Sequence, residues 1–477
     1  MADRAVALAP CTAILPWLLP SDAHGSLLIL DRENIIDRNT LFWQGPVVHV
    51  TEFPTTGMDT LFHGIVEVSA SKPCALIDLR ALLEPDGFHL RIGPNRIAGC
   101  REQWGLFVDR THRTRLIRLS SNADIVSCRH LFPGRTKQLP AFLLRRRVEP
   151  FACLWTNASA MGTRLDQAIA VAGPDHRIVV PGMIQEKDKF TIEMLNPLGR
   201  SSFLKLPLSR RADEDLDKAA AMIRALRQHL DSDDPLRLLI PQTPTVFEFE
   251  GRRGWLENGC VGKPLAEIKE PGDALAAFEH ACTLIRALKN VNADALPPLL
   301  IDHGEELRSH LANRIQGAPD ILRDAFQTIL LGLRRFDGDV HLRKGDMTLS
   351  NILVEGREVK GLIDWDDCGL TRQPLADLAD LVLSWTWRKE GMSRAQAIAW
   401  LLGPTTQVLT SGFDLDRLLD LAGGDRRSFQ LAVLQSWLDH AHNELIHPRA
   451  SGRPDRIRTL LIEPLAILEP LLPCLLD

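Results

Sequence analysis

The sequence predicts an α+β protein in which an α/β N-terminal region precedes a small strand-rich lobe and a larger helical lobe. In the N-terminal region, short apolar runs such as SLLIL and PVVHV alternate with helical patches such as CALIDLRALL, as strands and helices do in an α/β domain. Three strand-like runs follow, KFTIEML, SSFLKLPL and TVFEFEGRRGWLENG. After Gly262 the apolar residues recur at the spacing of amphipathic helices.

The length of the chain indicates more than one domain. A chain of 477 residues is too long for one ordinary core, because domains average about 150 residues. We expect an α/β domain over residues 1–150, a connection over 151–176, the strand-rich lobe over 177–262 and the helical lobe over 263–477. The connection is placed where Gly, Pro and polar residues weaken the apolar pattern, with room for one helix.

Charge and cysteine usage narrow the class of protein. The formal net charge of -5 and the pI near 6.3 provide no basic field for a phosphate backbone, so we expect no nucleic-acid partner. No apolar run approaches the roughly 18 residues that span a bilayer, so we expect no membrane span. The nine cysteines are odd in number and never form a C-x-x-C pair, which favours reduced thiols and a cytoplasmic location. The sequence pattern does not indicate an oligomeric state.

The strand-rich lobe begins with a predicted hairpin. Its two strand-like runs are joined by residues 196–200, where Pro197 and Gly199 supply turn dihedrals. A helix from about Asp213 to His229 comes next, with acidic residues in its first turn. Its apolar side is predicted to carry Leu216, Met222, Ile223 and Leu226. The order is therefore strand, strand, helix, strand.

The helical lobe shows several apolar stripes. Two of them have clear helical spacing: Leu275, Phe278, Cys282, Ile285 and Leu288 in the first, and Ile321, Ala325, Ile329 and Leu333 in the second. Further amphipathic segments are predicted at about residues 375–387, 429–445 and 456–461.

One segment inside the helical lobe carries polar residues suited to chemistry. In HLRKGDMTLSNILVEGREVKGLIDWDD, the apolar runs 351–354 and 359–363 flank a turn at 355–357, which predicts a hairpin. The hairpin places Asp346 and Asn351 on the loop that leads into its first strand and Asp364 at the end of its second. All three side chains can converge.

Phosphoryl transfer needs such a group, because it depends on positioning and electrostatics more than on covalent help from the protein. One carboxylate orients or deprotonates the acceptor hydroxyl, and a second holds Mg²⁺ with the help of an amide oxygen. Asp346, Asp364 and Asn351 fit these roles in that order. The alternative is a loop in which the same residues only cap or form turns.

The segment also resembles a known family. Lys344-Gly345-Asp346, followed after four residues by Asn351, is similar to the catalytic loop of aminoglycoside phosphotransferase and choline kinase-like enzymes. The run 361–365, GLIDW, resembles their metal-binding segment, and Pro374 and Asp377 fit the pattern that follows. Upstream, Leu204-Lys205 on a strand and the runs 255–257 and 262–265 resemble the nucleotide-binding lysine strand and the hinge. The resemblance covers about residues 177–447.

This resemblance implies a two-lobed, protein-kinase-like phosphotransferase domain that uses ATP and Mg²⁺. It implies that Asp346 is the catalytic residue, that Asn351 and Asp364 bind the metal and that Lys205 contacts the nucleotide. The expected activity is transfer of the γ-phosphate to a hydroxyl of a small molecule. A sugar, an aminoglycoside or an amino-alcohol are all open as acceptors.

Three departures from the family pattern motivate a second hypothesis. Lys344 stands where members usually carry His, and Ala219 stands near the place of the glutamate that usually pairs with the lysine. Asp215 or Asp217 could hold Lys205 instead. The segment 182–189, GMIQEKDK, lacks a glycine signature for a phosphate-covering loop. The alternative is a catalytically impaired pseudokinase that binds nucleotide or acts as a scaffold.

The N-terminal region carries a second, short resemblance. The run 82–90, LLEPDGFHL, and the later 93–96, GPNR, resemble the latter half of class I methyltransferase domains, over about fifty residues. No Gly-x-Gly loop follows an earlier strand, so the part that would hold S-adenosylmethionine is missing. The resemblance therefore implies a degenerate methyltransferase-like or docking domain, and the alternative is an unrelated α/β domain.

Overall fold

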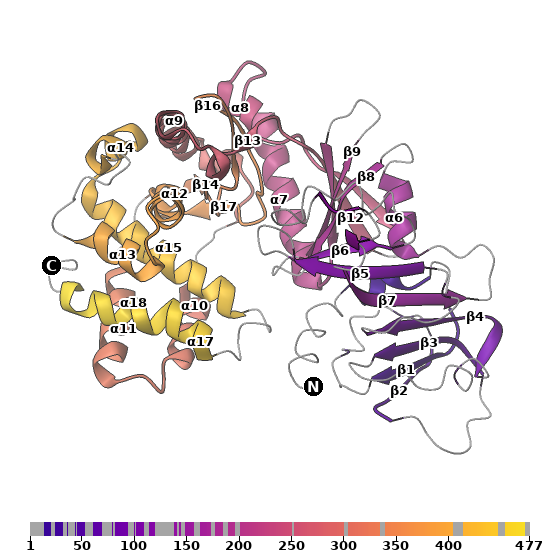
Figure 1. The fold of residues 1–477 in the computed structure, drawn as a ribbon. Helices are drawn as coiled ribbons and strands as arrows, with labels where there is room; N and C mark the ends of the chain where they lie inside the picture. Colours follow the sequence, from indigo (N-terminus) through magenta and orange to yellow (C-terminus); the bar gives the residue numbers. More distant parts are fainter. Residues whose placement is uncertain are drawn as a thin grey trace. The chain divides into compact units, whose positions relative to one another are not determined.

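A β-sheet and a helical body dominate the two units into which the computed structural model divides (Figure 1). The first unit comprises residues 1–213 and 245–258, and the second comprises residues 214–244 and 259–477. The structure describes residues 14–20, 24–31, 36, 43, 45–52, 61–68, 79, 82–93, 100, 102–108, 114–119, 138–140, 143–144, 148–156, 163–172, 177–184, 189–195, 201–249, 252–299, 304–333, 339–403, 414–446 and 454–472.

The first unit is built on one continuous sheet with the strand order β11-β12-β10-β9-β8-β6-β5-β7-β4-β3-β1-β2. Strands β1 to β4 are parallel, β7 is antiparallel to β4, and the remaining neighbours are antiparallel. Their bounds are β1 Leu27–Asp31, β2 Val47–Val50, β3 Phe62–Val68, β4 Leu83–Ile92, β5 Glu102–Val108, β6 Thr114–Arg118, β7 Glu149–Thr156, β8 Arg177–Ile184, β9 Lys189–Leu195, β10 Ser201–Pro207, β11 Thr245–Phe249 and β12 Arg252–Asn258.

Burial explains the composition of the parallel strands. Every residue of β1 and of β3 is buried, as expected for parallel strands that are covered on both faces. This is why their sequences read as nearly continuous apolar runs. The parallel part of the sheet agrees with the α/β character that the apolar runs predict for the N-terminal region.

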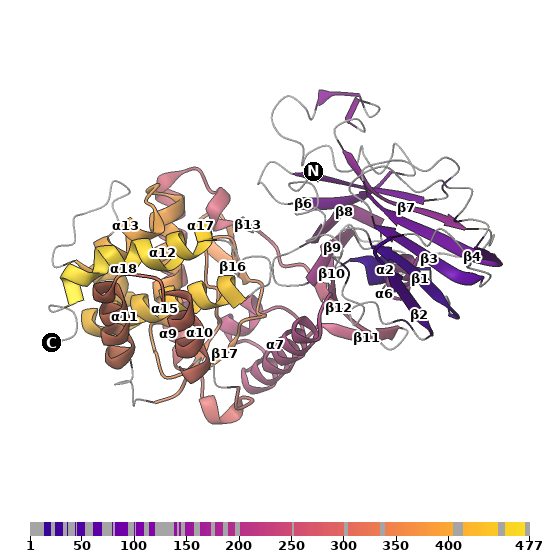
Figure 2. The same ribbon diagram turned by 90° about the horizontal axis from the view of Figure 1, so that it is seen from below.

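Two short helices pack on one face of the sheet. They are α2 Leu15–Leu18 and α6 Arg164–Ala172, which contact each other (Figure 2). Trp17 of α2 is fully buried, donates a hydrogen bond from Nε1 to the Pro207 carbonyl at 3.3 Å and lies 5.2 Å beneath the Arg252 guanidinium. The first described residues of the chain are therefore anchored on strands β10 and β12.

Residues 151–176, predicted to connect two domains, contribute to the sheet itself. They include most of β7, which lies between β4 and β5, and the helix α6. On the far side of this segment, β8 pairs with β6, so strands from both sides of residue 176 share one sheet. The predicted division into residues 1–150, 151–176, 177–262 and 263–477 therefore stays a proposal.

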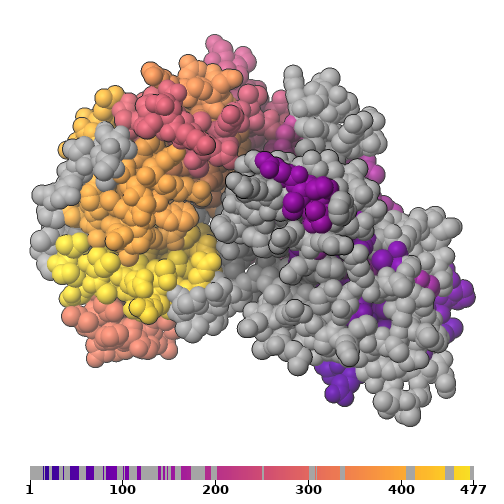
Figure 3. All heavy atoms as spheres, viewed as in Figure 1, coloured from indigo at the N-terminus to yellow at the C-terminus, as the bar shows by residue number. Residues whose placement is uncertain are grey.

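The second unit is mainly helical. Its α-helices are α7 Arg210–His229, whose first turn belongs to the first unit, α8 Pro235–Leu239, α9 Pro271–Lys289, α10 Gly304–Arg314, α11 Asp320–Leu333, α12 Ala376–Arg388, α13 Arg394–Leu402, α14 Leu415–Ala422, α15 Arg426–Ile446, α17 Pro454–Ile457 and α18 Glu463–Leu468. Short 3-10 turns lie at Leu265–Glu267, Ala293–Ala295 and Glu469–Leu471, and a π-helical turn at Arg458–Ile462. Helices α13 and α18 are in contact, and Figure 3 shows residues near 400 (orange) adjoining the C-terminal segment (yellow).

Short strands complete the second unit. Strands β13 Lys263–Pro264, β15 Ile352–Glu355 and β16 Glu358–Leu362 form one small sheet, and β14 His341–Arg343 pairs with β17 Gly369–Thr371. The predicted hairpin at residues 351–363 is confirmed, because β15 and β16 are antiparallel neighbours. The hairpin predicted for residues 189–208 is also confirmed by the antiparallel pairing of β9 with β10.

The predicted helix stripes are mostly confirmed. Helix α7 buries the four residues expected on its apolar side, and α9 buries Phe278, Cys282, Ile285 and Leu288. The stripe on α11 was wrong at its first position, because Ile321 is 57% exposed and its neighbour Leu322 is buried. The buried face of α11 is therefore rotated by one residue at its N-terminal end.

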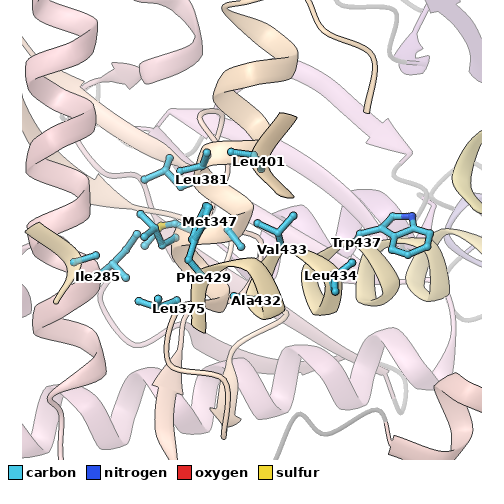
Figure 4. Close-up of a cluster of buried hydrophobic side chains, with 14 of the residues drawn as sticks. Ile285, Met347, Leu375, Leu381, Leu401, Phe429, Ala432, Val433, Leu434 and Trp437 are labelled. Atoms are coloured by element: carbon cyan, nitrogen blue, oxygen red, sulfur yellow. The ribbon is translucent and has the colours of Figure 1, made fainter. Parts of the chain in front are cut away.

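The core of the second unit includes apolar residues of the segment that carries Asp346 and Asn351. Figure 4 shows Met347, which directly follows Asp346, among side chains of α9, α12, α13 and α15 such as Ile285, Leu381 and Phe429. Met347 is fully buried. Because a buried side chain in a well-packed core has little freedom, it fixes the position of the residue before it.

In the part of the chain that the structure describes, no helix is both long and apolar enough to cross a bilayer.

Candidate active site

Two residues with positive φ angles mark the candidate site. Asp346 has φ 43° and Asp364 has φ 58°, and they are the non-glycine residues with positive φ among those described. The left-handed conformation is uncommon for residues with a Cβ and often marks functional positions. Both were predicted as site residues from the sequence.

Gly345 allows the backbone to approach closely just before Asp346. Its φ is 69°, and a Cβ at this position would lie 2.2 Å from the Asp367 carbonyl oxygen. Only glycine fits without displacing backbone. The backbone of the loop that carries Asp346 therefore packs closely against the segment that follows Asp364.

Asp346 and Asn351 lie in direct contact. The Asn351 side chain donates from Nδ2 to the Asp346 carbonyl oxygen and to Asp346 Oδ2, each at 2.9 Å. The turn between them is closed by the Thr348 amide on the Asp346 carbonyl and by the Asn351 amide on the Thr348 carbonyl. Because Nδ2 makes these bonds, the amide oxygen of Asn351 is the atom that remains to act as a ligand.

Asp364 is brought to the same place by the hairpin. The Ile363 amide donates to the Asn351 carbonyl at 2.9 Å, so the residue before Asp364 is tied to Asn351. The carboxylates of Asp346 and Asp364 are both partly exposed, whereas Asn351 is buried. The structure thus brings together three of the four site residues predicted from the sequence.

Lys344 joins the two loops. Its ammonium group donates to the Asp346 carbonyl at 3.2 Å and to the Asp364 carbonyl at 2.8 Å. The side chain is completely buried, and this burial lowers the pKa of Lys344 against the opposing effect of Asp346 and Asp364. The lysine that departs from the family pattern therefore holds the loop of Asp346 and the segment of Asp364 together.

Asp377, at the start of α12, fixes the backbone of the same loop. Its carboxylate accepts hydrogen bonds from the Lys344 amide at 2.8 Å and from the Gly345 amide at 2.9 Å. Burial raises the pKa of Asp377, and the charge of Arg343 opposes this rise. Its contacts are those of a residue that orders the lobe through buried hydrogen bonds.

Arg343 is a site residue that the sequence reasoning missed. Its guanidinium donates to Asp439 on α15 at 2.7 Å and to Asp380 on α12 at 3.1 Å. Burial lowers the pKa of Arg343, but the charges of Asp380 and Asp439 outweigh burial and raise it overall. Burial raises the pKa of Asp380 to about 6 although Arg343 lowers it. The repeat of Asp377 and Asp380 on one helix face is the sequence signal that could have indicated this cluster.

Lys205 lies in the first unit, on β10, and is 6% exposed. Its ammonium group pairs with Glu257 Oε1 of β12 at 2.9 Å. Phe203 is the register partner of Glu257, and Lys205 is that of Trp255, so both charged side chains are on the same face of neighbouring strands. Sequence reasoning considered Asp215 or Asp217 as partners and missed Glu257, whose position across the sheet has no local sequence signal.

Ala219 is buried in the core of the second unit, on α7. The position is thus occupied by a packing residue. In the segment 182–189, residues 185–188 lie outside the described part of the chain, as do residues 94–96 of the N-terminal resemblance.

The comparisons with known proteins indicate the same class of enzyme. The model of the phosphotransferase enzyme family APH matches residues 195–412, which include Lys205, Asp346, Asn351 and Asp364. The sequence of this part of the chain is thus similar to a family of phosphotransferases, the class of enzyme that the motifs around Asp346 and Asp364 predict.

Solved structures similar to the chain include three aminoglycoside phosphotransferases. One is a thermostable mutant of APH(4)-Ia in ternary complex with ADP and hygromycin B, with 15% identity, a TM-score of 0.42 and coverage of 64% of this chain and 98% of that chain. A GDP and kanamycin complex of APH(2")-IIIa has 13% identity, a TM-score of 0.44 and coverage of 63% and 96%. A gentamicin complex of APH(2")-IIa has 13% identity, a TM-score of 0.41 and coverage of 66% and 99%.

No curated protein matches the chain at a significant level. The methyltransferase-like resemblance of the N-terminal region finds no support in these comparisons and stays a prediction from the sequence.

We expect Arg343→Leu to lower the free energy of unfolding by about 3–5 kcal/mol, because it leaves Asp380 and Asp439 buried without their cation. Urea denaturation followed by fluorescence measures this. Arg357→Leu is the matched control, since Arg357 is 72% exposed in its pair with Asp273 and such pairs contribute little. Equal losses in the two variants would contradict the assignment of Arg343 as a buried organiser.

Proposed function

We propose that the phosphotransferase domain transfers the γ-phosphate of ATP, with Mg²⁺, to a hydroxyl of a small molecule. The observation that carries the proposal is the convergence of Asp346, Asn351 and Asp364 on two loops that are tied together by Lys344. Free thiols at Cys100, Cys282 and Cys368 are compatible with the cytoplasmic location proposed from the sequence.

In this proposal Asp346 is the catalytic base. Its carboxylate takes the proton from the acceptor hydroxyl while the hydroxyl oxygen forms a bond to the γ-phosphorus. The bond between the γ-phosphorus and the bridging oxygen breaks, and ADP leaves with that oxygen. The hydrogen bond from Asn351 to Asp346 Oδ2 holds the carboxylate in one orientation, and Oδ1 is left to face the acceptor.

The donor atoms of the site fit Mg²⁺. Oxygen ligands are what this ion prefers, and the site offers the amide oxygen of Asn351 and the carboxylate of Asp364. When bound, Mg²⁺ would neutralise charge on the phosphates. Lys344 sits behind both loops with its charge directed at carbonyl oxygens, so it positions these ligands without competing for the phosphates.

Lys205 is proposed to contact the nucleotide phosphates, and Glu257 to position Lys205. The ion pair at 2.9 Å gives Lys205 a partner on the neighbouring strand, in place of the helix glutamate that Ala219 replaces. Because both side chains are largely buried, the pair restricts the lysine to few rotamers. The acceptor is proposed to be an aminoglycoside, a sugar or an amino-alcohol.

The second candidate is a pseudokinase that binds nucleotide without turning it over. It is favoured by Ala219 at the glutamate position. It is disfavoured by the contacts of Lys344 and by the Lys205–Glu257 pair. Lys344 takes the place of the usual His, and Glu257 takes the place of the usual helix glutamate. A protein that had lost catalysis would not need to keep either interaction.

Titration of Mg-ATP by calorimetry tests the proposal. Wild-type protein is expected to bind saturably, and Asp364→Ala to weaken binding by at least about tenfold, since it removes a charged oxygen ligand. Asp346→Ala is expected to bind nucleotide but to lose about 10²–10⁴-fold in turnover with a panel of acceptors. Glu355→Ala, at the exposed turn of the same hairpin, is the control and should behave as wild type. Binding without turnover in the wild type, unchanged by Asp346→Ala, would establish the pseudokinase instead.

Lys344→Met tests the link between the loops. It keeps the length of the side chain but removes both hydrogen bonds, so we expect kcat to fall by roughly 10–100-fold through misplacement of the reacting groups. Lys344→His, with the residue usual in the family, should lose less. A wild-type kcat for Lys344→Met would show that the loops keep their positions without this contact.

Glu257→Gln tests the positioning of Lys205. The neutral amide holds the ammonium group less firmly, so we expect the KM for ATP to rise by about tenfold at an affinity loss near 1.4 kcal/mol, with a smaller change in kcat. Glu248→Gln on the exposed part of β11 is the matched control. Steady-state kinetics with varied ATP distinguishes the two, and an unchanged KM in Glu257→Gln would exclude the role.

A further inference from the structure

His63, Glu84 and Asp86 form a cluster in the first unit that the phosphotransferase chemistry does not use. His63 Nδ1 lies 3.4 Å from Glu84 Oε2 and 3.9 Å from Asp86 Oδ1. One possible metal-ligand atom from each residue, an imidazole nitrogen or a carboxylate oxygen, lies within 4.8 Å of the other two. Among the described residues, this is the group of three or more His, Cys, Asp or Glu side chains that is placed closely enough to hold a metal ion. Both carboxylates come from the segment 82–90, which carries the short N-terminal resemblance described in the sequence analysis.

The backbone builds this cluster through an irregularity between β3 and β4. In the parallel register Phe62 pairs with Leu83, but the next pair is Gly64 with Phe88. Residues 84–87 therefore bulge out opposite the single residue His63. Bulges of this kind re-aim side chains and are frequent beside functional sites. Glu84 and Asp86, two residues apart, are thus both directed to the imidazole.

Gly87 closes the bulge onto the His63 backbone. A Cβ at this position would lie 2.8 Å from the His63 carbonyl oxygen and 3.0 Å from the Glu84 carbonyl oxygen. A larger residue would push the bulge away from β3. The glycine therefore keeps the two carboxylates within reach of the histidine.

The imidazole ring of His63 is held in a fixed orientation. It is 5% exposed, stacks on the His24 ring with centroids 5.6 Å apart, and meets the edge of the Phe88 ring at 6.2 Å. Glu84 is partly exposed and Asp86 is exposed. The site thus has one rigid nitrogen ligand at its base and two carboxylates that can adjust at its mouth.

The charge at the cluster is unbalanced. Among the described residues, neither Glu84 nor Asp86 has an ion pair with Lys or Arg, and the ionisable group beside them is His63. Two carboxylates beside one imidazole create a local excess of negative charge. Such an excess favours a cation.

We propose that His63, Glu84 and Asp86 bind a divalent transition-metal ion of the Zn²⁺ type. Metal bonds of about 2.0–2.2 Å to nitrogen and carboxylate oxygen place tetrahedral ligands roughly 3.3 Å apart, close to the 3.4 Å between His63 and Glu84. Asp86 needs to move by less than about 1 Å, which rotation of an exposed side chain supplies. The nitrogen ligand favours Zn²⁺ over Mg²⁺, which prefers oxygen ligands alone.

Three protein ligands leave at least one coordination position for water or an anionic ligand. This is the ligand count of zinc sites that bind a further molecule, whereas purely structural sites are closed by four ligands. The cluster lies near the amino ends of β3 and β4 and in a different unit from Asp346, Asn351 and Asp364. It is a second metal site, independent of the Mg²⁺ of the proposed function.

Equilibrium dialysis of the full chain, stripped with chelator, against Zn²⁺ or Co²⁺ tests the proposal. The double variant Glu84→Gln/Asp86→Asn removes both carboxylate charges at partly exposed positions, where folding should persist. Glu248→Gln in the same unit is the matched control, and Asp364→Ala separates this site from the phosphotransferase site. Circular dichroism and thermal melting of the metal-free proteins confirm that each variant is folded.

We expect the double variant to bind about one equivalent less of Zn²⁺ than wild type, and Glu248→Gln to bind as wild type does. Asp364→Ala should keep the equivalent that the double variant loses. Bound Co²⁺ should show visible absorption without a thiolate charge-transfer band, which excludes cysteine ligands. The rise in melting temperature on adding Zn²⁺ should disappear in the double variant. Equal stoichiometry in wild type and double variant, or Mg²⁺ binding as tight as Zn²⁺, would overturn the proposal, and the kinase assays would be unaffected by that result.

Discussion

Two adjacent buried cations hold the candidate active site in place. Arg343 ends β14 and engages Asp380 and Asp439 on two long helices, whereas Lys344 turns to the carbonyl oxygens of the two functional loops. The two side chains connect the core of the helical unit to the loops, and Met347 adds an apolar anchor on the other side of Asp346. Buried charges are costly unless they are paired, so this arrangement makes the position of the loops depend on the integrity of the whole cluster.

The two strained aspartates are understandable in these terms. A left-handed residue with a Cβ costs of order 1–3 kcal/mol and persists where its surroundings determine it fully. At Asp346 and Asp364 the surroundings include the Lys344 ammonium, the carboxylate of Asp377 on the neighbouring amides and the hairpin bond from Ile363 to Asn351. These contacts hold both residues in the left-handed conformation although each carries a Cβ.

Much of the helical unit and the convergence of Asp346, Asn351 and Asp364 followed from the sequence, because they depend on local patterns. The hairpin around Gly356 and the apolar stripe on α9 are visible in the sequence, because both arise from apolar residues that recur within a few positions of one another. The partners of Arg343 and Lys205 could not be predicted from the sequence. Asp439 is 96 residues from Arg343 along the chain, and Glu257 lies on β12 whereas Lys205 lies on β10. The place of β7 between β4 and β5 was equally hidden, because its apolar run is the same whether a strand is central or peripheral.

The continuity of the sheet has a consequence for how the phosphotransferase domain can be handled in isolation. Strand β10, which carries Lys205, is followed across the sheet by β9, β8 and then β6, and Trp17 packs against the end of β10. A fragment that starts near residue 177 would expose the edge of β8 and remove the apolar cover supplied by α2 and α6. Open edges of this kind promote aggregation, so we expect the strand that carries Lys205 to stay soluble only when the N-terminal strands are kept with it.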